Sequence, residues 1–342
     1  MLITGEITSK AVVDAELIAR DTLCRIGYDR ASHGMDGRTV EVLNKISSQS
    51  PEIANAVSKE GGDIGAGDQG MCFGYACAET PAFMPLAHHL SFEIINLLQG
   101  DINVRLSKNW GQDVPDWNSV FLPDAKSQVT IEYDDSGKAR RVDTVVVSTC
   151  HKPGLTMGDL RGQISRVVID PIRRKWSGLF DDKTKWLINP AGLWTIGGPA
   201  ADTGLSGRKI VVDNYGSDSV VGGGSYSGKC STKVDRSGAY MARYVAKNLV
   251  AAGVSSKVQL QVAYAIGVAE PVSLRILCDR SGKELEHILE MVKNTVSFSP
   301  KGIIDRLNLR RPIYAATATG GHFGRNEFPW EKLDLVDIFK KI

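Results

Sequence analysis

A glycine-rich stretch between residues 197 and 235 combines the residue types that bind phosphate groups. Its basic side chains are Arg208, Lys209, Lys229 and Lys233, and its carboxylates include Asp202, Asp213 and Asp235. Glycines let a backbone approach a ligand closely and present N–H groups to anionic oxygens. Lysines add point charges, arginine adds a planar pair of donors, and aspartates hold the Mg²⁺ that bridges phosphate oxygens. The stretch therefore predicts a site for the polyphosphate of a nucleotide, centred on residues 222–235.

A P-loop is one alternative interpretation of the same residues. Gly223, Gly228 and Lys229 have the P-loop spacing, but Cys230 stands where a P-loop has the Ser or Thr that binds Mg²⁺. The preceding segment is a Ser/Asp-rich turn rather than a buried strand, and the predicted helix begins several residues too late. These departures argue against a P-loop ATPase. The other alternative is a solvated glycine-rich loop with scattered lysines.

Two shorter runs carry weaker signals of the same kind. Asp68 lies between glycines in the run GAGDQG, where a carboxylate can reach an amine or a ribose hydroxyl without steric cost. Asp124, Ala125 and Lys126 stand at the start of a predicted strand. Taken alone, the first run is equally an Asp-bearing turn, and the second is equally an ion pair at a strand edge.

Helices and strands that could position these residues follow from hydrophobic periodicity and turn signals. Strands are predicted at 2–7, 127–133, 142–149, 186–189, 194–197, 209–213, 258–268 and 274–278. Helices are predicted at 13–27, 40–46, 85–100, 155–173, 236–252 and 282–292. Residues 50–63 have little periodicity and predict a lid loop. Because helices and strands mix without strict βαβ alternation, and hairpins are common, the pattern favours an α+β fold.

Composition limits the class of protein further. The 342 residues suggest two or three domains, and a net charge of +2 gives no reason to expect nucleic-acid or membrane binding. No run approaches the roughly 20 apolar residues of a membrane span, and the first ten residues do not resemble a signal peptide. The six cysteines are scattered, which is typical of reduced thiols. We therefore expect a soluble, cytoplasmic protein.

Seven motifs, in order along the chain, together resemble the S-adenosylmethionine synthetase (methionine adenosyltransferase) family. The two signature-like segments are GAGDQGMCFGYA at 65–76 and GGGSYSGKCSTKVDRS at 222–237. The other matching runs are LPDAKSQVT, INPAGLWTIGGP, TGLSGRKI, VAYAIGVAEP and GGHFGRNEFPWEK. The resemblance extends from Gly5 to about Asp334. It implies an α+β fold of three similar domains with approximate threefold symmetry, the first of them incomplete, divided here at 1–63, 64–195 and 196–342.

The resemblance implies a transferase of one-carbon metabolism that joins methionine to ATP and then cleaves the released triphosphate to pyrophosphate and phosphate. The residues found agree with that chemistry. A thioether sulfur is already a nucleophile, so the demand falls on neutralising and aligning a highly charged leaving group. A site rich in Lys, Arg and Mg²⁺, without a Ser/His/Asp arrangement, meets that demand. The implied cofactors are Mg²⁺ and K⁺.

The resemblance also assigns roles by position. The catalytic residues, which contact the triphosphate, are Lys126, Arg208, Lys209 and Lys229. ATP is further contacted by Asp124, Ala125, Trp194, Asp202, Ser225 and Ile266. Methionine is contacted by Glu6, Gln49, Asp68, Asp202 and Lys233. Asp235 is the implied Mg²⁺ ligand, and the site spans two subunits of a homodimer or tetramer, with Glu6, Gln49 and Asp68 from the neighbouring subunit.

Departures from the family pattern shape the functional expectation. Cys230 replaces an acidic residue, Leu193 and Trp194 stand where Arg-Phe is common, and the region 85–120 is longer than its equivalent. The family's His-Pro-Asp-Lys motif does not occur in the sequence. We expect a small separate polypeptide to supply it. The alternatives are a catalytically inactive homologue acting as a binding or regulatory subunit, and a mis-assigned start codon.

Overall fold

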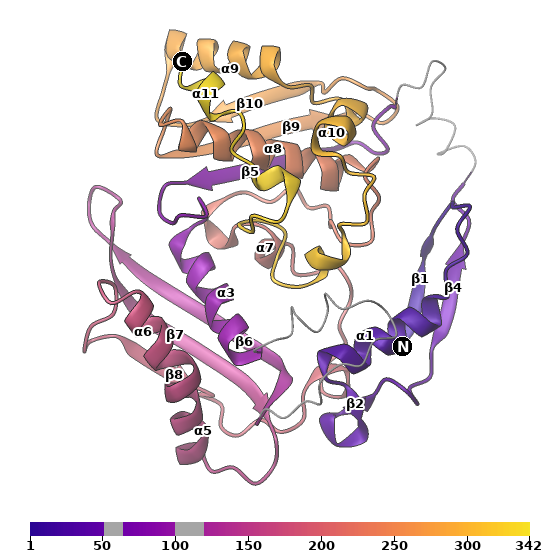
Figure 1. Cartoon of the computed structure of the whole chain (residues 1–342), viewed down its shortest axis with the longest axis vertical. Coiled ribbons are helices and arrows are strands. Elements are labelled where there is room, and N and C mark those ends of the chain that lie inside the picture. Colours follow the sequence, from indigo (N-terminus) through magenta and orange to yellow (C-terminus); the bar gives the residue numbers. More distant parts are fainter. Residues whose placement is uncertain (51–63, 100–119) are drawn as a thin grey trace. The chain divides into compact units, whose positions relative to one another are not determined.

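The computed structural model describes residues 1–50, 64–99 and 120–342. The chain forms two compact units, each built from two separated stretches. The first unit contains residues 1–49 and 90–205, and the second contains residues 50–89 and 206–342 (Figure 1). Most of the predicted lid loop, at 51–63, and most of the lengthened region, at 100–119, lie outside the described residues. Helices and small, largely antiparallel sheets confirm the α+β fold.

The first unit begins with two parallel strands, β1 (Leu2–Glu6) and β4 (Leu43–Ser47), which pair in register from Leu2 opposite Leu43 to Glu6 opposite Ser47. The helix predicted over 40–46 is therefore wrong. The backbone of Leu43–Ser47 is committed to the ladder with β1, and strand pairing overrides the helical spacing of three apolar residues. In the sequence between these two strands, β2 (Asp29–Arg30), a 3₁₀ turn (Ala31–His33) and β3 (Met35–Asp36) form a short hairpin.

Helix α1 (Ala15–Ile26) confirms the helix predicted near 13–27. Asp14 caps its first turn by accepting a hydrogen bond from the Leu17 amide, and Gly27 ends it at φ 109°. A φ in the left-handed region suits glycine, which has no Cβ to clash there.

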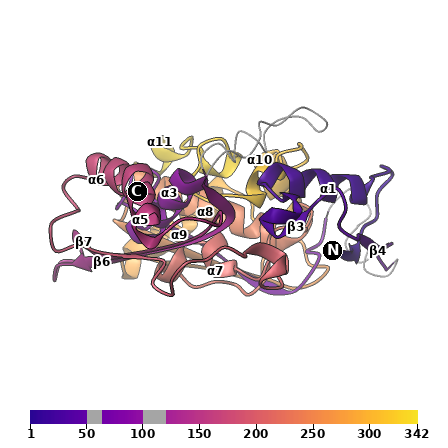
Figure 2. The same ribbon diagram turned by 90° about the horizontal axis from the view of Figure 1, so that it is seen from below.

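The second sheet of the first unit has the order β6-β7-β8. Strands β6 (Phe121–Tyr133) and β7 (Ala139–His151) form the predicted hairpin around residues 134–137, and β8 (Lys185–Ile188) runs parallel to β7. The helix predicted over 155–173 is α5 (Met157–Ile164) and α6 (Asp170–Lys175), joined by a π-helical turn (Ser165–Ile169). Figure 2 shows α5 and α6 on the same side of this sheet.

A strand at 194–197 was also predicted and does not form. The main chain of Trp194 is instead bonded to one histidine at the end of β7: its carbonyl accepts from the His151 amide at 2.9 Å, and its own amide donates to His151 Nε2 at 3.2 Å. The Trp194 indole N–H turns back to the Ile196 carbonyl at 2.6 Å. These hydrogen bonds satisfy the main chain of Trp194 within a loop, so the segment does not pair as a strand.

The second unit is built on an antiparallel sheet of order β10-β9-β5, with β5 (Gly70–Cys77), β9 (Lys257–Tyr264) and β10 (Ser273–Leu277). Helix α8 (Val234–Ala251) packs along β5 and β9 (Figure 1). The approach is close, because a Cβ built on Gly74 would lie 2.0 Å from the carbonyl carbon of Ala242. Only glycine allows the strand and helix backbones to meet there.

Three further helices of the second unit pack around this core. They are α9 (Gly282–Thr295), α10 (Pro300–Leu307) and α11 (Val336–Phe339). Helix α3 (Leu86–Gln99) begins in the second unit and ends in the first, and it confirms the helix predicted over 85–100. None of the described helices is long and apolar enough to cross a membrane.

Residues 209–213, predicted as a strand, form a single helical turn, α7 (Ile210–Asp213). The turn closes locally, because the Asp213 amide donates to the Lys209 carbonyl at 2.9 Å and the Asn214 amide group donates to the Ile210 carbonyl at 2.6 Å. His88 Nε2 adds a contact to the Val212 carbonyl at 2.9 Å. Side-chain bonds of this kind compete with strand pairing, and here they outweigh the β-branched residues of the segment.

Candidate functional site

The predicted polyphosphate loop lies at the N-terminus of α8 in the second unit. Residues 222–233 run as an irregular segment into the helix, whose first turn contains Asp235. Lys229 Nζ and Asp235 Oδ2 lie 2.5 Å apart, with 31% of the lysine side chain and 13% of the aspartate side chain exposed. A cation and a carboxylate, both partly shielded from water, thus meet at a helix end whose free N–H groups favour anions.

Glycines make this meeting sterically possible. A Cβ on Gly224 would lie 2.4 Å from the Asp235 carboxyl carbon, and a Cβ on Gly222 would lie 2.1 Å from the Met71 carbonyl oxygen on β5. Real Cβ atoms do not approach so closely, so the loop wraps Asp235 and the strand only because these positions lack side chains. Gly223 and Gly228 adopt φ values of 88° and 87°, which shape the turns of the loop.

The turn that carries Asp68 lies against the same region. A Cβ on Gly67 would meet the Lys233 side chain at 3.0 Å, and one on Gly70 would meet Asp235 Oδ1 at 3.4 Å. Main-chain bonds join the turn to the segment after β9: the Ala66 amide donates to the Val268 carbonyl at 2.9 Å, and the Gly267 amide donates to the Ala66 carbonyl at 2.8 Å.

The second unit therefore brings most of its predicted site residues into one neighbourhood. Gly207 directly precedes Arg208 and Lys209, and a Cβ there would lie 2.4 Å from Ser225 Cβ. The residues gathered around the loop are Asp68, Arg208, Lys209, Ser225, Lys229, Lys233, Asp235 and Ile266. Arg208, Lys209, Asp68 and Ile266 are exposed, so their polar or apolar ends are available to a ligand.

The other predicted site residues belong to the first unit. Asp124 Oδ2 accepts a hydrogen bond from the Gly198 amide at 2.8 Å, which ties the start of β6 to the loop after Trp194. On β6, Ala125 faces Thr149 and the exposed Lys126 faces Ser148. Asp202 lies in the exposed segment that follows this loop.

Glu6 and Gln49 stand at the ends of the paired strands β1 and β4. The strands remain joined just beyond Glu6, where the Ile7 amide donates to the Ser47 carbonyl at 2.9 Å. The Gln49 amide donates to Thr8 Oγ1 at 3.3 Å. This pairing places both predicted methionine-contacting residues at one end of the two-stranded sheet, with Glu6 exposed.

Two supporting residues were not identified from the sequence. Tyr28 is buried beneath the loop of the first unit, where a Cβ on Gly198 would overlap its hydroxyl at 2.2 Å. Burial, with further contributions from Asp124 and Cys150, raises the pKa of Tyr28 to about 12. Arg236 is buried behind the polyphosphate loop and donates from Nη1 to the Lys229 carbonyl at 2.8 Å. An aromatic residue in a turn and an arginine in a helix carry no distinctive sequence signal.

Three buried side chains of the second unit that could act as nucleophiles or bases, Cys72, His88 and His322, are held in their neutral forms. Cys72 is buried, its thiol donates to the Val234 carbonyl at 3.0 Å, and burial together with Asp235 raises its pKa far above the ordinary value. Burial lowers the pKa of His88 to about 4, and burial with nearby Arg236 and Arg325 lowers that of His322 to about 3. These groups are neutral at pH 7, so the neighbourhood suits electrostatic stabilisation of an anion better than covalent catalysis.

The donor set fits a magnesium ion that is shared with phosphate. Asp235 offers a carboxylate at a helix N-terminus, in a space that a Cβ on Gly224 would fill. Within residues 1–50, 64–99 and 120–342, no group of three or more His, Cys, Asp or Glu side chains could form a complete cage. Mg²⁺ commonly binds through one or two carboxylates plus phosphate oxygens and water, which matches this arrangement.

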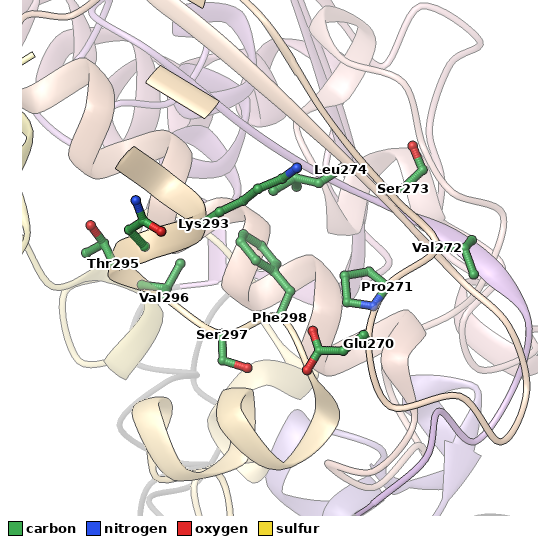
Figure 3. Close-up of a pocket in the computed structure, with 11 residues that line it drawn as sticks. Glu270, Pro271, Val272, Ser273, Leu274, Lys293, Thr295, Val296, Ser297 and Phe298 are labelled. Carbon is green, nitrogen blue, oxygen red and sulfur yellow. The ribbon is translucent and has the colours of Figure 1, made fainter. Parts of the chain in front are cut away.

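A separate cavity of about 560 Å³ lies on the second unit, between the segment after β9 and the end of α9 (Figure 3). Its polar lining includes Glu270, Lys293, Thr295 and Ser297, and its apolar lining includes Phe298. None of the predicted site residues lines it. The cavity is therefore distinct from the loop at the N-terminus of α8.

Known domain models match three successive stretches of the chain. Residues 196–332 match the model of the S-adenosylmethionine synthetase C-terminal domain, residues 63–194 that of the central domain, and residues 1–51 that of the N-terminal domain. The chain belongs to the S-adenosylmethionine synthetase family. The three matches also establish a fold of three similar α+β domains.

Two curated relatives show how much of the chain the family relationship covers. An S-adenosylmethionine synthase from Oenococcus oeni is 47% identical over 348 residues, and one from Pseudothermotoga lettingae is 46% identical over 357 residues. Each comparison covers 99% of this chain and 86% of the relative. The resemblance inferred from the motifs is therefore confirmed.

Proposed function

We propose that this chain catalyses the synthesis of S-adenosylmethionine from ATP and methionine, followed by cleavage of the triphosphate to pyrophosphate and phosphate. The observation that carries the proposal is the pairing of Lys229 with Asp235 at the N-terminus of α8, inside a glycine loop too tight for side chains. Its relatives in the family are named S-adenosylmethionine synthase, which supports the same reaction.

In the first step, the methionine sulfur attacks the ribose C5′ of ATP. A sulfur–carbon bond forms, the bond from C5′ to the phosphate oxygen breaks, and triphosphate leaves with the electron pair. The sulfur needs no base, so the residues act on the leaving group. We assign this role to Lys126, Arg208, Lys209 and Lys229, whose charges neutralise the triphosphate as it departs.

The remaining contacts are proposed from the family match, position by position. ATP is held by Asp124, Ala125, Trp194, Asp202, Ser225 and Ile266 in addition to the basic residues. Methionine is held by Glu6, Gln49, Asp68, Asp202 and Lys233. We further propose that the enzyme is a homodimer or tetramer in which Glu6, Gln49 and Asp68 act on the substrates of the neighbouring subunit.

Metal ions complete the charge balance in this proposal. Asp235 would hold Mg²⁺, which supplies positive charge to the phosphate oxygens when bound. K⁺ is proposed as the second cofactor. Since no group of three or more potential ligand side chains gathers at the loop among the described residues, we propose that a segment bearing His-Pro-Asp-Lys contributes further metal and triphosphate contacts.

The test is an assay of the purified chain with ATP, methionine, Mg²⁺ and K⁺, with and without a synthetic fragment carrying His-Pro-Asp-Lys. We expect S-adenosylmethionine to form when the fragment is present and little or none to form without it; full activity of the chain alone would refute the need for a separate polypeptide. Lys229→Ala should lower kcat/KM for ATP by about 100-fold, the effect of losing a single preorganised charge contact. Lys257→Ala, at the exposed start of β9, is the matched control and should leave kcat/KM unchanged.

Two outcomes would contradict the proposal. No S-adenosylmethionine under either condition would favour a catalytically inactive homologue with a binding or regulatory role. ATP hydrolysis that does not depend on methionine would favour an ATPase.

A further inference from the structure

Arg236 joins the polyphosphate loop to the C-terminal segment of the second unit. Its side chain is buried in the first turn of α8, next to Asp235 in sequence. Nη1 donates to the Lys229 carbonyl at 2.8 Å, and Nη2 donates to Thr317 Oγ1 at 2.7 Å. The guanidinium also lies over the Tyr314 ring, 4.2 Å from its centroid. One planar side chain thus links the main chain of Lys229 to Tyr314 and Thr317, which lie far along the sequence.

A second branch of the same network reaches the loop at Ser227. Arg236 Nε donates to Tyr240 Oη at 3.0 Å, and Tyr240 Oη lies 2.7 Å from His322 Nδ1. His322 Nε2 in turn lies 3.4 Å from Ser227 Oγ. Because Tyr240 Oη already accepts from the arginine, its proton is free to be donated to His322 Nδ1.

The direction of these bonds fixes the tautomer of His322. Its pKa of about 3 keeps the ring neutral, so a ring that accepts at Nδ1 carries its proton on Nε2 and donates to Ser227. Burial raises the pKa of Tyr240 to about 12, so the phenol keeps its proton. The bonds therefore run one way, from Arg236 through Tyr240 and His322 to Ser227, without any change in protonation at neutral pH.

Arg236 is buried without a carboxylate partner among the described residues. The direct partners that Arg236 has among the described residues are a carbonyl, two hydroxyl groups and two aromatic rings, all of them neutral. Burying a charge among neutral partners is less favourable than pairing it with a carboxylate, as Glu331 does for Arg243 in the same helix. The shape of the guanidinium explains why an arginine stands at this position, because only a guanidinium donates hydrogen bonds to all three partners at once.

We propose that Arg236 is a positioning residue for triphosphate binding, which holds Lys229 through its carbonyl and Ser227 through Tyr240 and His322. This inference rests on the proposed function of the loop and deepens it. It gives a role to Thr317 and to the GGHFGR segment, which lie outside the set of ligand contacts. The glycines between Gly222 and Lys229 then allow the conformation of the loop, and the network of Arg236 holds the loop in it.

The direct test replaces the planar guanidinium of Arg236 and keeps its positive charge. In Arg236→Lys, the affinity for inorganic triphosphate, measured by calorimetry on the full chain, should fall by about 10- to 100-fold, as expected for loss of charge-assisted hydrogen bonds. The KM for methionine should change little. An affinity equal to that of the unaltered chain would overturn the proposal, because it would show that charge alone is needed.

A double-mutant cycle separates positioning from general destabilisation. If Arg236 acts through Lys229 and Ser227, then Arg236→Lys should change triphosphate affinity by less than about twofold in a background that carries both Lys229→Ala and Ser227→Ala. The same full loss in both backgrounds would contradict the proposal. Arg243→Lys is the matched control, since it alters a buried arginine of the same helix whose bonds go to Glu331 and to carbonyls of residues 75–83. It should lower stability and leave triphosphate affinity unchanged.

If Arg236→Lys does not fold, the less disruptive variant Tyr240→Phe tests the same network. Tyr240→Phe keeps the ring stacked on Trp330, with centroids 3.7 Å apart, and removes only the hydroxyl that links Arg236 to His322. We expect a loss of triphosphate affinity that disappears in a Ser227→Ala background, and additive losses would refute the link. Failure of the unaltered chain to bind triphosphate would refute the proposed function itself, so the two failures are distinguishable.

Discussion

Lys229 and Asp235 occupy a small volume that two glycines leave open. Gly224 gives room to the carboxylate, and Gly222 lets the loop touch the backbone of β5. A lysine beside an aspartate is ordinarily a weak surface pair, but here both groups are partly buried at a helix N-terminus. Their electrostatic effect on a bound polyphosphate is correspondingly larger than that of exposed charges.

The proposed role of Asp235 predicts how activity depends on magnesium. Asp235→Asn keeps an oxygen at the site but removes its charge, so the Mg²⁺ concentration for half-maximal activity should rise by at least about tenfold, since even losing a supporting partner of a metal ligand has effects of this size. Titration of activity with Mg²⁺ measures it. Asp305→Asn, which alters an exposed pair with Lys301, should leave the titration unchanged. An unaltered Mg²⁺ dependence in Asp235→Asn would remove this residue from the metal site.

At the scale of the elements, the second unit depends on the close packing of α8 against β5. The inner face of α8 is fully buried, and the strand is buried from Cys72 to Cys77. Gly74 is the point of nearest approach. The loop ends where α8 begins and contacts β5 near its first residues, so the positions of Lys229 and Asp235 depend on that packing.

A methyl group at this contact should loosen the unit. In Gly74→Ala, the added Cβ would overlap the backbone of α8, and overpacking of this kind lowers the free energy of unfolding by about 3 kcal/mol. Denaturation in urea measures the change. Gly162→Ala, on the exposed face of α5 with open space around it, should be neutral or slightly stabilising. Equal stability of the two variants would show that β5 and α8 are not packed as described.

The buried histidines predict how stability depends on pH. His88 on α3 has a pKa of about 4, well below its ordinary 6.5, so the unfolded chain binds more protons than the folded one between these values. Stability is then fully present above about pH 6.5 and falls as the pH is lowered, by up to about 1.4 kcal/mol per pH unit for each such histidine. His322 acts in the same direction.

Urea denaturation between pH 7 and pH 5 tests this dependence. His88→Asn should reduce the slope of unfolding free energy against pH, whereas His287→Asn, on the exposed face of α9, should not. The same slope in His88→Asn and the unaltered chain would contradict burial of a neutral imidazole.

Elements with strong, continuous periodicity were predictable from the sequence, and those that depend on distant partners were not. The long helix of 236–252 and the hairpin around residues 134–137 carry their own signals and were found within a few residues. Strand β5 was missed, because its glycines read as a turn and its pairing partner lies almost two hundred residues away. The strand predicted at 209–213 is a helical turn that local side-chain bonds hold.

The same distinction applies to the candidate site. Lys229, Asp235 and the glycines around them were found from residue type and spacing, since their chemistry is local to one loop. Arg236, Tyr240 and His322 were not, because the bonds that join them connect α8 with residues 317–322. A sequence shows which residues can bind phosphate more readily than which residues hold them in place.

At the scale of the whole molecule, two compact units share a chain that matches one enzyme family over 99% of its length. The first unit contains Lys126 and the residues around Asp124, and the second contains the loop with Lys229. The proposed reaction draws on residues from both. Its central requirement is that triphosphate is formed only when methionine displaces it from ATP.

The most direct measurement is the product balance of one reaction, followed by phosphorus NMR and chromatography with the His-Pro-Asp-Lys fragment present. The proposed function predicts S-adenosylmethionine, pyrophosphate and phosphate in equal amounts, no products without methionine, and loss of all three together in Lys229→Ala. Phosphate released without methionine, or S-adenosylmethionine formed at an unchanged rate in Lys229→Ala, would contradict the assignment of the loop to triphosphate.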